Sequence, residues 1–296
     1  MGIQKGLCCV AVCTSLVTVG MTALADDQQA PGAAPAVVVV AAPAPAGEAG
    51  VRLPVSYTER GITNPAMILS PVLDVSLIRI QPAVAGLAVP AATGAALTLG
   101  AGFSITDDFG VRATVVNAQF ASNDTEYLGP TVGATYRFLK GDFEMGVALD
   151  MLISTPAPVG VVIGPSIPMR LHMGKAAVLD IQPTIPISTP EKTTVGLNVP
   201  VAVAYDIVEP SVHIGANTGV AMTFNPPQGV TVGDTFSVPL GVFAGYAVPG
   251  KDGPIVDIDP YFRWPALFIP GAGDGLSKAQ AGIFQLGVTV TGYIYL

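Results

Sequence analysis

The side chains best suited to chemistry are acids, arginines and the two histidines, which recur at alternate positions of long segments. His172 and His213 have no cysteine near them, so they make a poor metal site. No serine, histidine and acid stand at a spacing typical of hydrolases. Asp257 and Asp259 suit a solvated turn better than a cation site. We therefore expect no enzymatic activity, no cofactor and no metal.

These side chains would have a different role if the segments that carry them closed into a barrel around a pore. Inside such a lumen, charged side chains can contact solutes and select them by size and sign. The alternative is a filled pore, in which opposite charges pair and limit the cost of desolvation. The residues that we expect to line the lumen and to contact a solute are Asp74, Arg112, Arg137, Glu144, Asp150, Arg170, Asp180, Asn217, Asp257, Asp259 and Arg263.

The pattern that positions these residues is alternation of apolar with small or polar side chains. In the segment 142–153, for example, Phe143 and Met145 alternate with Asp142 and Glu144. Because successive side chains of a strand point to opposite faces, each such segment has one apolar face and one face of small and charged residues. The charges of these segments keep to the second face.

Two kinds of β protein show such alternation. A soluble sandwich would cover its exposed face with lysine and glutamate, whereas here that face is mostly glycine, alanine, serine and threonine, which suits a narrow lumen. The segments are about 11–15 residues long, while sandwich strands average about five or six and a tilted membrane strand needs roughly 9–11. The sequence therefore predicts an all-β fold, an antiparallel transmembrane β-barrel.

The composition agrees with this fold. Of the 296 residues, 50% are hydrophobic and 11% are charged, against about 25% charged in ordinary soluble domains. Beyond the N-terminus no apolar run reaches the roughly 18 residues of a membrane-spanning helix. The net charge of −8 argues against nucleic acid as a partner, because no basic patch is present.

We predict about twelve strands, with connections that alternate between short and long. Short periplasmic turns and longer outer loops are typical of membrane barrels, and an even strand count places both chain ends in the periplasm. The strands are expected near 66–80, 93–106, 110–120, 128–139, 141–154, 159–174, 176–188, 194–207, 210–224, 235–248, 254–268 and 281–296.

This topology divides the lumen residues into two groups. Arg112, Arg137 and Arg170 are expected near the periplasmic end, with Glu144, Asp180, Asp206 and Asp257 available as partners. Lying deeper, and better placed for contact with a solute, are Asp74, Asp150, Asn217 and Arg263.

The last segment ends in an amphipathic strand at Tyr293-Ile294-Tyr295-Leu296. In this it resembles bacterial outer-membrane β-barrel proteins of the porin type, whose final strand is their assembly signal. That family usually ends in phenylalanine with an aromatic residue two positions earlier, so this chain departs from the pattern by one position. The resemblance covers residues 66–296, points to no subfamily, and implies outer-membrane lipid and the assembly machinery as partners.

The N-terminus reads as an export signal over residues 1–25, with Lys5, a short apolar core and the cleavage site Ala23-Leu24-Ala25. All 3 cysteines lie within the first 13 residues, so the mature chain is expected to lack thiols. Residues 26–60 contain Ala-Pro repeats and are predicted to be a disordered periplasmic leader. The barrel is assigned to residues 61–296.

Prolines within several expected strands fit this picture least well, because each lacks a ladder donor. They indicate either bulges or irregular strands at Pro165, Pro168, Pro183, Pro186, Pro200, Pro239 and Pro260.

Two functions are consistent with these features. One is a porin-like channel or transporter that passes small solutes across the outer membrane. The other is a structural or adhesive barrel with a filled lumen, whose loops or leader bind partners. The solute, the oligomeric state, gating and the inward folding of loops 81–92 or 225–234 stay open at this point.

Overall fold

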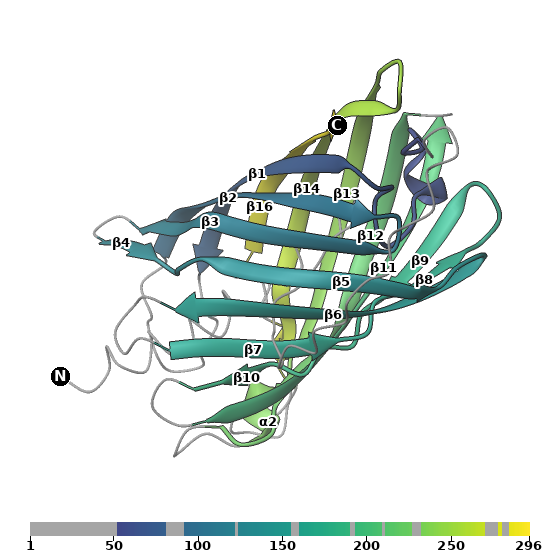
Figure 1. Ribbon diagram of the computed structural model, residues 1–296. Helices are drawn as coiled ribbons and strands as arrows, with labels where there is room; N and C mark the ends of the chain where they lie inside the picture. Colours follow the sequence, from purple (N-terminus) through teal and green to yellow (C-terminus); the bar gives the residue numbers. More distant parts are fainter. Residues whose placement is uncertain are drawn as a thin grey trace.

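The computed structural model describes residues 52–80, 92–121, 124–154, 160–189, 193–208, 211–226, 232–269, 278–279 and 284–296. These residues form a closed antiparallel barrel of twelve strands (Figure 1). The described part of the chain contains no helix that is long and apolar enough to span a membrane. The predicted signal at residues 1–25 lies outside the described residues.

Several of the twelve strands are divided by a short interruption and carry more than one label. β4 and β5 form one strand, as do β7 and β8, β9 and β10, and β15 to β17. In chain order the elements are η1 (Tyr57–Glu59), β1 (Ile68–Ile80), β2 (Ala92–Thr106), β3 (Phe109–Ala121), β4 (Asp124–Tyr127), β5 (Thr131–Leu139), β6 (Phe143–Ser154), β7 (Gly160–Ser166), β8 (Met169–His172), β9 (Ala177–Ile181), β10 (Ile187–Ser188), β11 (Thr194–Val208), β12 (Val212–Thr223), α2 (Val232–Thr235), β13 (Val238–Pro249), β14 (Pro254–Ile269), β15 (Lys278–Ala279), β16 (Phe284–Gly292) and β17 (Ile294–Tyr295).

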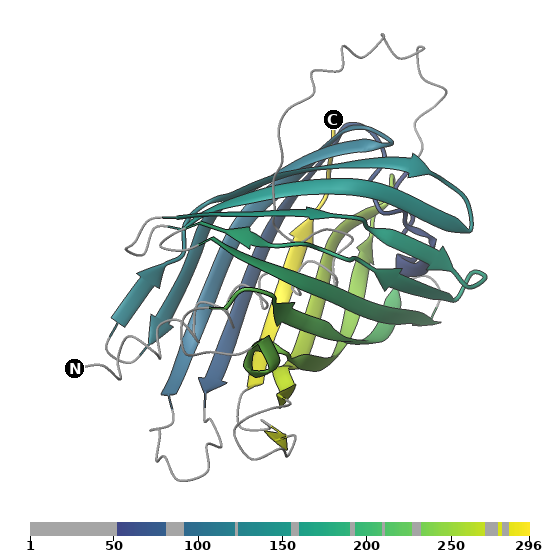
Figure 2. The same cartoon turned by 90° about the horizontal axis from the view of Figure 1, so that it is seen from below.

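Closure of the barrel depends on β1, which pairs with β2 on one side and with β16 and β17 on the other. Val75, for example, lies opposite Leu97 of β2 and Val288 of β16. All pairings are antiparallel, and Figure 2 shows the strands curving round into one continuous wall. Closure leaves no sheet edge exposed, which a strand in lipid requires.

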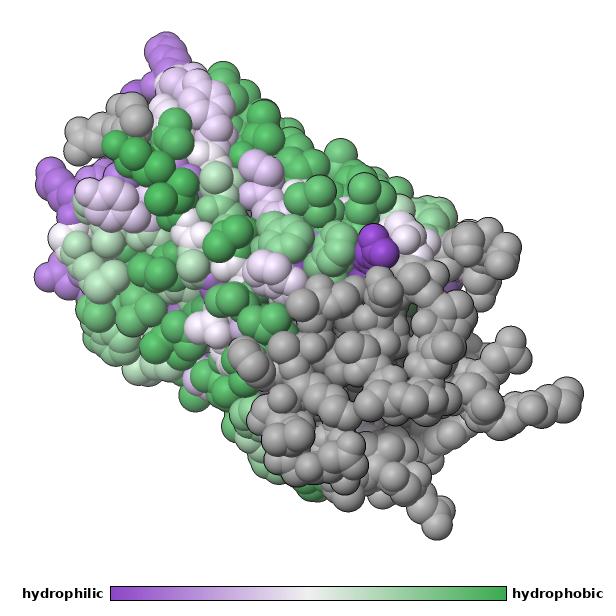
Figure 3. All heavy atoms as spheres, turned by 180° about the vertical axis from the view of Figure 1, so that it is seen from behind, coloured by the Kyte–Doolittle hydropathy of each residue, from purple (hydrophilic) through white to green (hydrophobic). Residues whose placement is uncertain are grey.

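The two faces of the wall are reversed relative to a soluble protein. Along β1, Leu73, Val75 and Leu77 are exposed, whereas Asp74 and Ser76 between them are buried. Figure 3 shows the resulting apolar outer face, with hydrophilic residues gathered at one end. Lipid would cover this band and the lumen holds most of the strand charges, so the predicted transmembrane barrel is confirmed.

Four of the seven prolines agree with one of the two interpretations, whereas Pro165, Pro200 and Pro260 lie in ladders whose register does not shift at them. Pro168 separates β7 from β8, and Pro183 and Pro186 lie between β9 and β10. Their carbonyls remain bonded: the amides of Gly146 and Ile167, for example, donate to Pro168 and Pro183 over 2.9 and 3.0 Å. The other interpretation, a bulge, applies at Pro239, where the register of β13 against β14 shifts.

Glycines on the lumen face are covered by large side chains of the neighbouring strand. Asp150 lies over Gly133, its partner across β5 and β6, and Phe243 lies over Gly215, its partner across β12 and β13. A methyl group at either glycine would overlap the covering side chain. Much of the space that these glycines leave in the lumen is therefore occupied.

This arrangement predicts that Gly133→Ala destabilises the barrel by about 1–3 kcal/mol, because the new methyl group would displace Asp150 and overpack the wall. Gly110→Ala is the matched control, since its nearest neighbour would lie at an ordinary 3.6 Å. Urea unfolding in lipid vesicles measures both. Equal stabilities of the two variants would contradict the assignment of Gly133 to a filled position.

The chain enters the barrel wall from inside. Residues 53–60, which were predicted to belong to the leader, lie in the lumen, and Leu53, Tyr57, Thr58 and Arg60 are fully buried. The chain then turns at Met67, whose φ is 64°, and continues into β1. Residues 53–60 therefore pack inside the barrel, and the boundary between leader and barrel stays a prediction.

Candidate functional site

Residues 52–66, here called the lumen plug, cross the end of the barrel at which the short turns lie (Figure 1). Near its start, the hydroxyls of Ser56 and Thr58 each donate to Asp206 of β11 over 2.6 Å. The Lys175 carbonyl at the β8–β9 turn is a second acceptor for the same Thr58 hydroxyl proton, and the Thr58 carbonyl contacts His172 Nδ1 at 2.8 Å.

Arg60 is the central contact of the plug. Its guanidinium forms an ion pair with Asp257 of β14, and one hydrogen bond of this pair, Nη2 to Oδ1, measures 3.1 Å. It also donates to Tyr293 Oη at 3.1 Å and to the plug's own carbonyls at Pro54 and Val55. Both charges are almost completely buried, with 0% and 1% of the side chains exposed.

The second half of the plug reaches the opposite wall. The Ile62 amide donates to Glu144 of β6 over 2.8 Å, and Thr63 donates to the Asp107 carbonyl in the β2–β3 turn. The Ala66 amide donates to the Asp107 carboxylate over 2.8 Å. The plug is therefore attached around the mouth of the barrel and not to one side of it.

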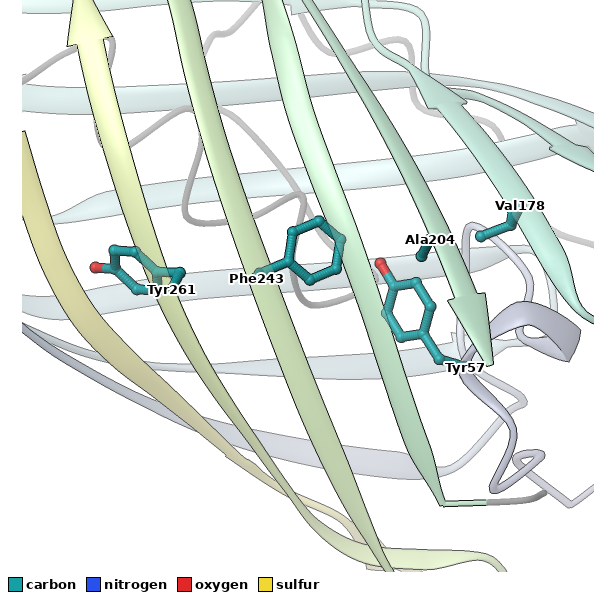
Figure 4. Close-up of a cluster of buried hydrophobic side chains, with 5 residues drawn as sticks. All are labelled: Tyr57, Val178, Ala204, Phe243 and Tyr261. Carbon is teal, nitrogen blue, oxygen red and sulfur yellow. The ribbon is translucent and has the colours of Figure 1, made fainter. Parts of the chain in front are cut away.

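An aromatic and apolar cluster continues from the plug into the lumen (Figure 4). Tyr57 of the plug stacks on His213 of β12, with ring centroids 4.4 Å apart, and Phe243 of β13 meets the same imidazole edge-on. Tyr261 of β14 projects from the next strand along the same row. The plug thus has an apolar contact with the wall as well as polar ones.

Three wall arginines also form ion pairs in the lumen. Arg137 pairs with Glu144 at 3.1 Å and with Asp108, and Arg170 pairs with Asp180 at 2.6 Å. The pairs Arg137–Glu144 and Arg170–Asp180 lie among the partners that the sequence predicted, whereas Asp108 does not. Arg170 additionally donates to the plug carbonyl of Arg60 over 3.0 Å, so this wall pair also supports the plug.

The predicted partners of the remaining lumen charges need correction. Arg112 pairs with Asp150 across Gly133, and Asp150 was not among the predicted partners. In the described part of the chain, Asp206 and Asp257 bind the plug and not a wall arginine, through Ser56, Thr58 and Arg60.

The deeper lumen residues lie in a buried polar layer beyond the plug. Asp74 accepts hydrogen bonds from Thr289 at 2.7 Å and Tyr261 at 3.1 Å. Asp259 lies 3.1 Å from the His213 Nε2 atom. Arg263 stacks on Tyr261, with its guanidinium carbon 4.0 Å from the ring centroid. Asn217 of β12 is in the same layer, at 1% exposure.

All eleven lumen residues predicted from alternation are therefore on the inner face, although contact with a solute stays a prediction. Sequence reasoning missed the plug side chains, above all Tyr57, Thr58 and Arg60. These residues follow no two-residue period, and their partners are more than 100 positions away in the chain. The only available signal was the return of charged residues after the Ala-Pro segment.

Comparison with known proteins finds similarity in structure alone. The sequence matches no family model and no curated protein. The fold is similar to an outer-membrane channel from Pseudomonas putida F1, with 12% identity, a TM-score of 0.55 and coverage of 78% of this chain and 96% of the channel. It is also similar to the NanC porin, with 10% identity, a TM-score of 0.51 and coverage of 75% and 100%. The chain therefore has the fold of bacterial outer-membrane β-barrel channel proteins.

Proposed function

We propose that this protein is an outer-membrane channel for small solutes whose periplasmic mouth is closed by the lumen plug. The fold and the apolar outer band support a place in the outer membrane. The plug lies at the end with the short turns, which in such barrels faces the periplasm. Export, passage through the assembly machinery and the absence of enzymatic activity stay predictions.

The observation that carries a channel function is the way in which the plug is attached. Among the described residues, the backbone of positions 52–65 joins no strand ladder of the wall. Its attachments are side-chain hydrogen bonds, ion pairs and ring contacts, above all those of Arg60 and Tyr57. The plug can therefore leave the mouth without breaking the barrel, and a closed barrel can become an open one.

The same plug favours a second candidate function, a structural or adhesive barrel with a permanently filled lumen. Buried ion pairs such as Arg60–Asp257 would then serve only to fix the plug in one position. The two functions differ in one measurable property, which is whether the barrel ever conducts ions.

Planar-bilayer recording of the purified full-length protein separates the candidates. The channel proposal predicts that openings to a conducting level interrupt a closed baseline, because the plug is held by contacts that form and break. Insertion of the folded barrel is checked independently by its heat-modifiable migration on a gel. A folded, inserted barrel that stays electrically silent over a wide voltage range would favour the structural candidate.

A further inference from the structure

Arg263 differs from the other described lumen arginines in its lack of a carboxylate partner. Each of the others forms an ion pair with an acid: Arg60, Arg112, Arg137 and Arg170. Arg263 forms none among the described residues, and its Nε, Nη1 and Nη2 atoms have no hydrogen-bond acceptor. The residue is only 1% exposed.

Its surroundings hold the guanidinium in place without neutralising it. Tyr261 packs against it at 4.0 Å, and the Tyr261 hydroxyl is itself fixed by a hydrogen bond to Asp74. The Asp74 carboxylate is engaged by Tyr261 and by Thr289, whose hydroxyl donates to it over 2.7 Å. The nearby acid therefore does not form a direct pair with Arg263.

Asn217 lies beside Arg263 and is also without partners. The two residues flank Gly241 in the register of three neighbouring strands, β12, β13 and β14. A methyl group at Gly241 would overlap Asn217 Oδ1 and would lie 2.9 Å from Arg263 Cγ, so both side chains lie over this glycine. Neither the oxygen nor the nitrogen of the Asn217 amide has a hydrogen-bond partner.

Such an arrangement is costly unless a ligand satisfies it. A buried charge without a partner and a buried amide without hydrogen bonds both destabilise the folded protein. A carboxylate is the natural complement, because it accepts two parallel N–H bonds from a guanidinium and a further one from an amide. The negative charge of a carboxylate would also neutralise Arg263, which is the one described lumen arginine that forms no ion pair with an acid.

We propose that Arg263 and Asn217 form a binding site for the carboxylate group of a small organic solute. Arg263 lies midway along β14, six positions after Asp257, the residue that pairs with Arg60 of the plug. Six positions correspond to about 20 Å along a strand. A solute that enters from the outer side would therefore meet this site before it reached the plug. The proposal rests on the proposed channel function and names the class of solute that the channel takes.

Acetate is the probe for this site. The full-length protein in neutral detergent is titrated with sodium acetate against sodium chloride of equal ionic strength, with binding followed by calorimetry. We expect saturable binding of acetate that weakens at least tenfold in Arg263→Gln and at least threefold in Asn217→Ala. Arg52→Gln is the control, since this arginine is exposed and pairs with Asp252 at the rim, and it should bind acetate like the unchanged protein.

The outcomes separate the site from the channel. Absence of saturable acetate binding to the folded protein, or equal binding by Arg263→Gln, would overturn the site even if the barrel conducts. Acetate binding that depends on Arg263 in a barrel that never conducts would support the site and reject the channel. If Arg263→Gln fails to fold, acetate binding by Asn217→Ala tests the site instead. This variant should fold, because the Asn217 amide has no hydrogen bond to the protein that the substitution would remove.

Discussion

Replacing Arg60 by alanine is expected to shift the barrel from mostly closed to mostly open and to raise its mean conductance severalfold. The substitution leaves Asp257 buried without its charged partner and removes the hydrogen bonds to Tyr293 and to the Pro54 and Val55 carbonyls. Breaking one side of a buried ion pair costs about 3–5 kcal/mol. An equilibrium between bound and released plug would then shift by roughly 100-fold or more.

Recording in planar bilayers measures this effect, and Arg52→Ala is the control from the same segment. Arg52 pairs with Asp252, but both side chains are more than half exposed, at 64% and 51%. Such a surface pair contributes about 0–1 kcal/mol, so its loss should leave the conductance unchanged. A folded Arg60→Ala barrel with the same open probability as Arg52→Ala would show that the plug does not control conduction.

A charge on the outer face should prevent stable insertion. Val75 is exposed in the middle of β1, and arginine at the centre of a bilayer costs about 2–4 kcal/mol in a membrane strand. Val75→Arg is therefore expected to lower the folded fraction in vesicles by roughly 30-fold or more. Heat-modifiable migration and urea unfolding in vesicles provide the two readouts.

The depth of the substitution supplies the control. Ile105 is exposed on the same outer face but lies at the end of β2, beside the short turn to β3. Arginine near the interface costs about 0–1 kcal/mol, so Ile105→Arg should fold almost normally. Equal losses in the two variants, or none in Val75→Arg, would place the apolar band in contact with something other than lipid.

The strands and their faces could be predicted because they depend on a local period. Alternation placed Asp74, Glu144 and Arg263 on the inner face, and the structure has all three there. The predicted bounds also agree closely, for example 254–268 against Pro254–Ile269 for β14. A one-residue slip would have moved these charges into lipid, so the pattern is strongly constrained.

The plug and the choice of ion-pair partners could not be predicted in the same way. Arg60 and Asp257 are separated by 197 positions, and no period connects them. Arg112 pairs with Asp150 two strands away because Gly133, on the strand between them, leaves room for the contact. Such contacts depend on the curvature of the closed wall and on the shape of neighbouring side chains, which alternation does not encode.

A reversible cross-link between plug and wall tests most directly whether the lumen plug opens and closes a membrane channel. With the chain's 3 cysteines, Cys8, Cys9 and Cys13, replaced by serine, Ser56→Cys and Asp206→Cys can be added and joined by a short thiol cross-linker that reductant cleaves. The two native side chains are 2.6 Å apart. We predict that bilayer current disappears on cross-linking and returns on reduction. An unchanged current through the cross-linked barrel, or silence after reduction, would contradict the account.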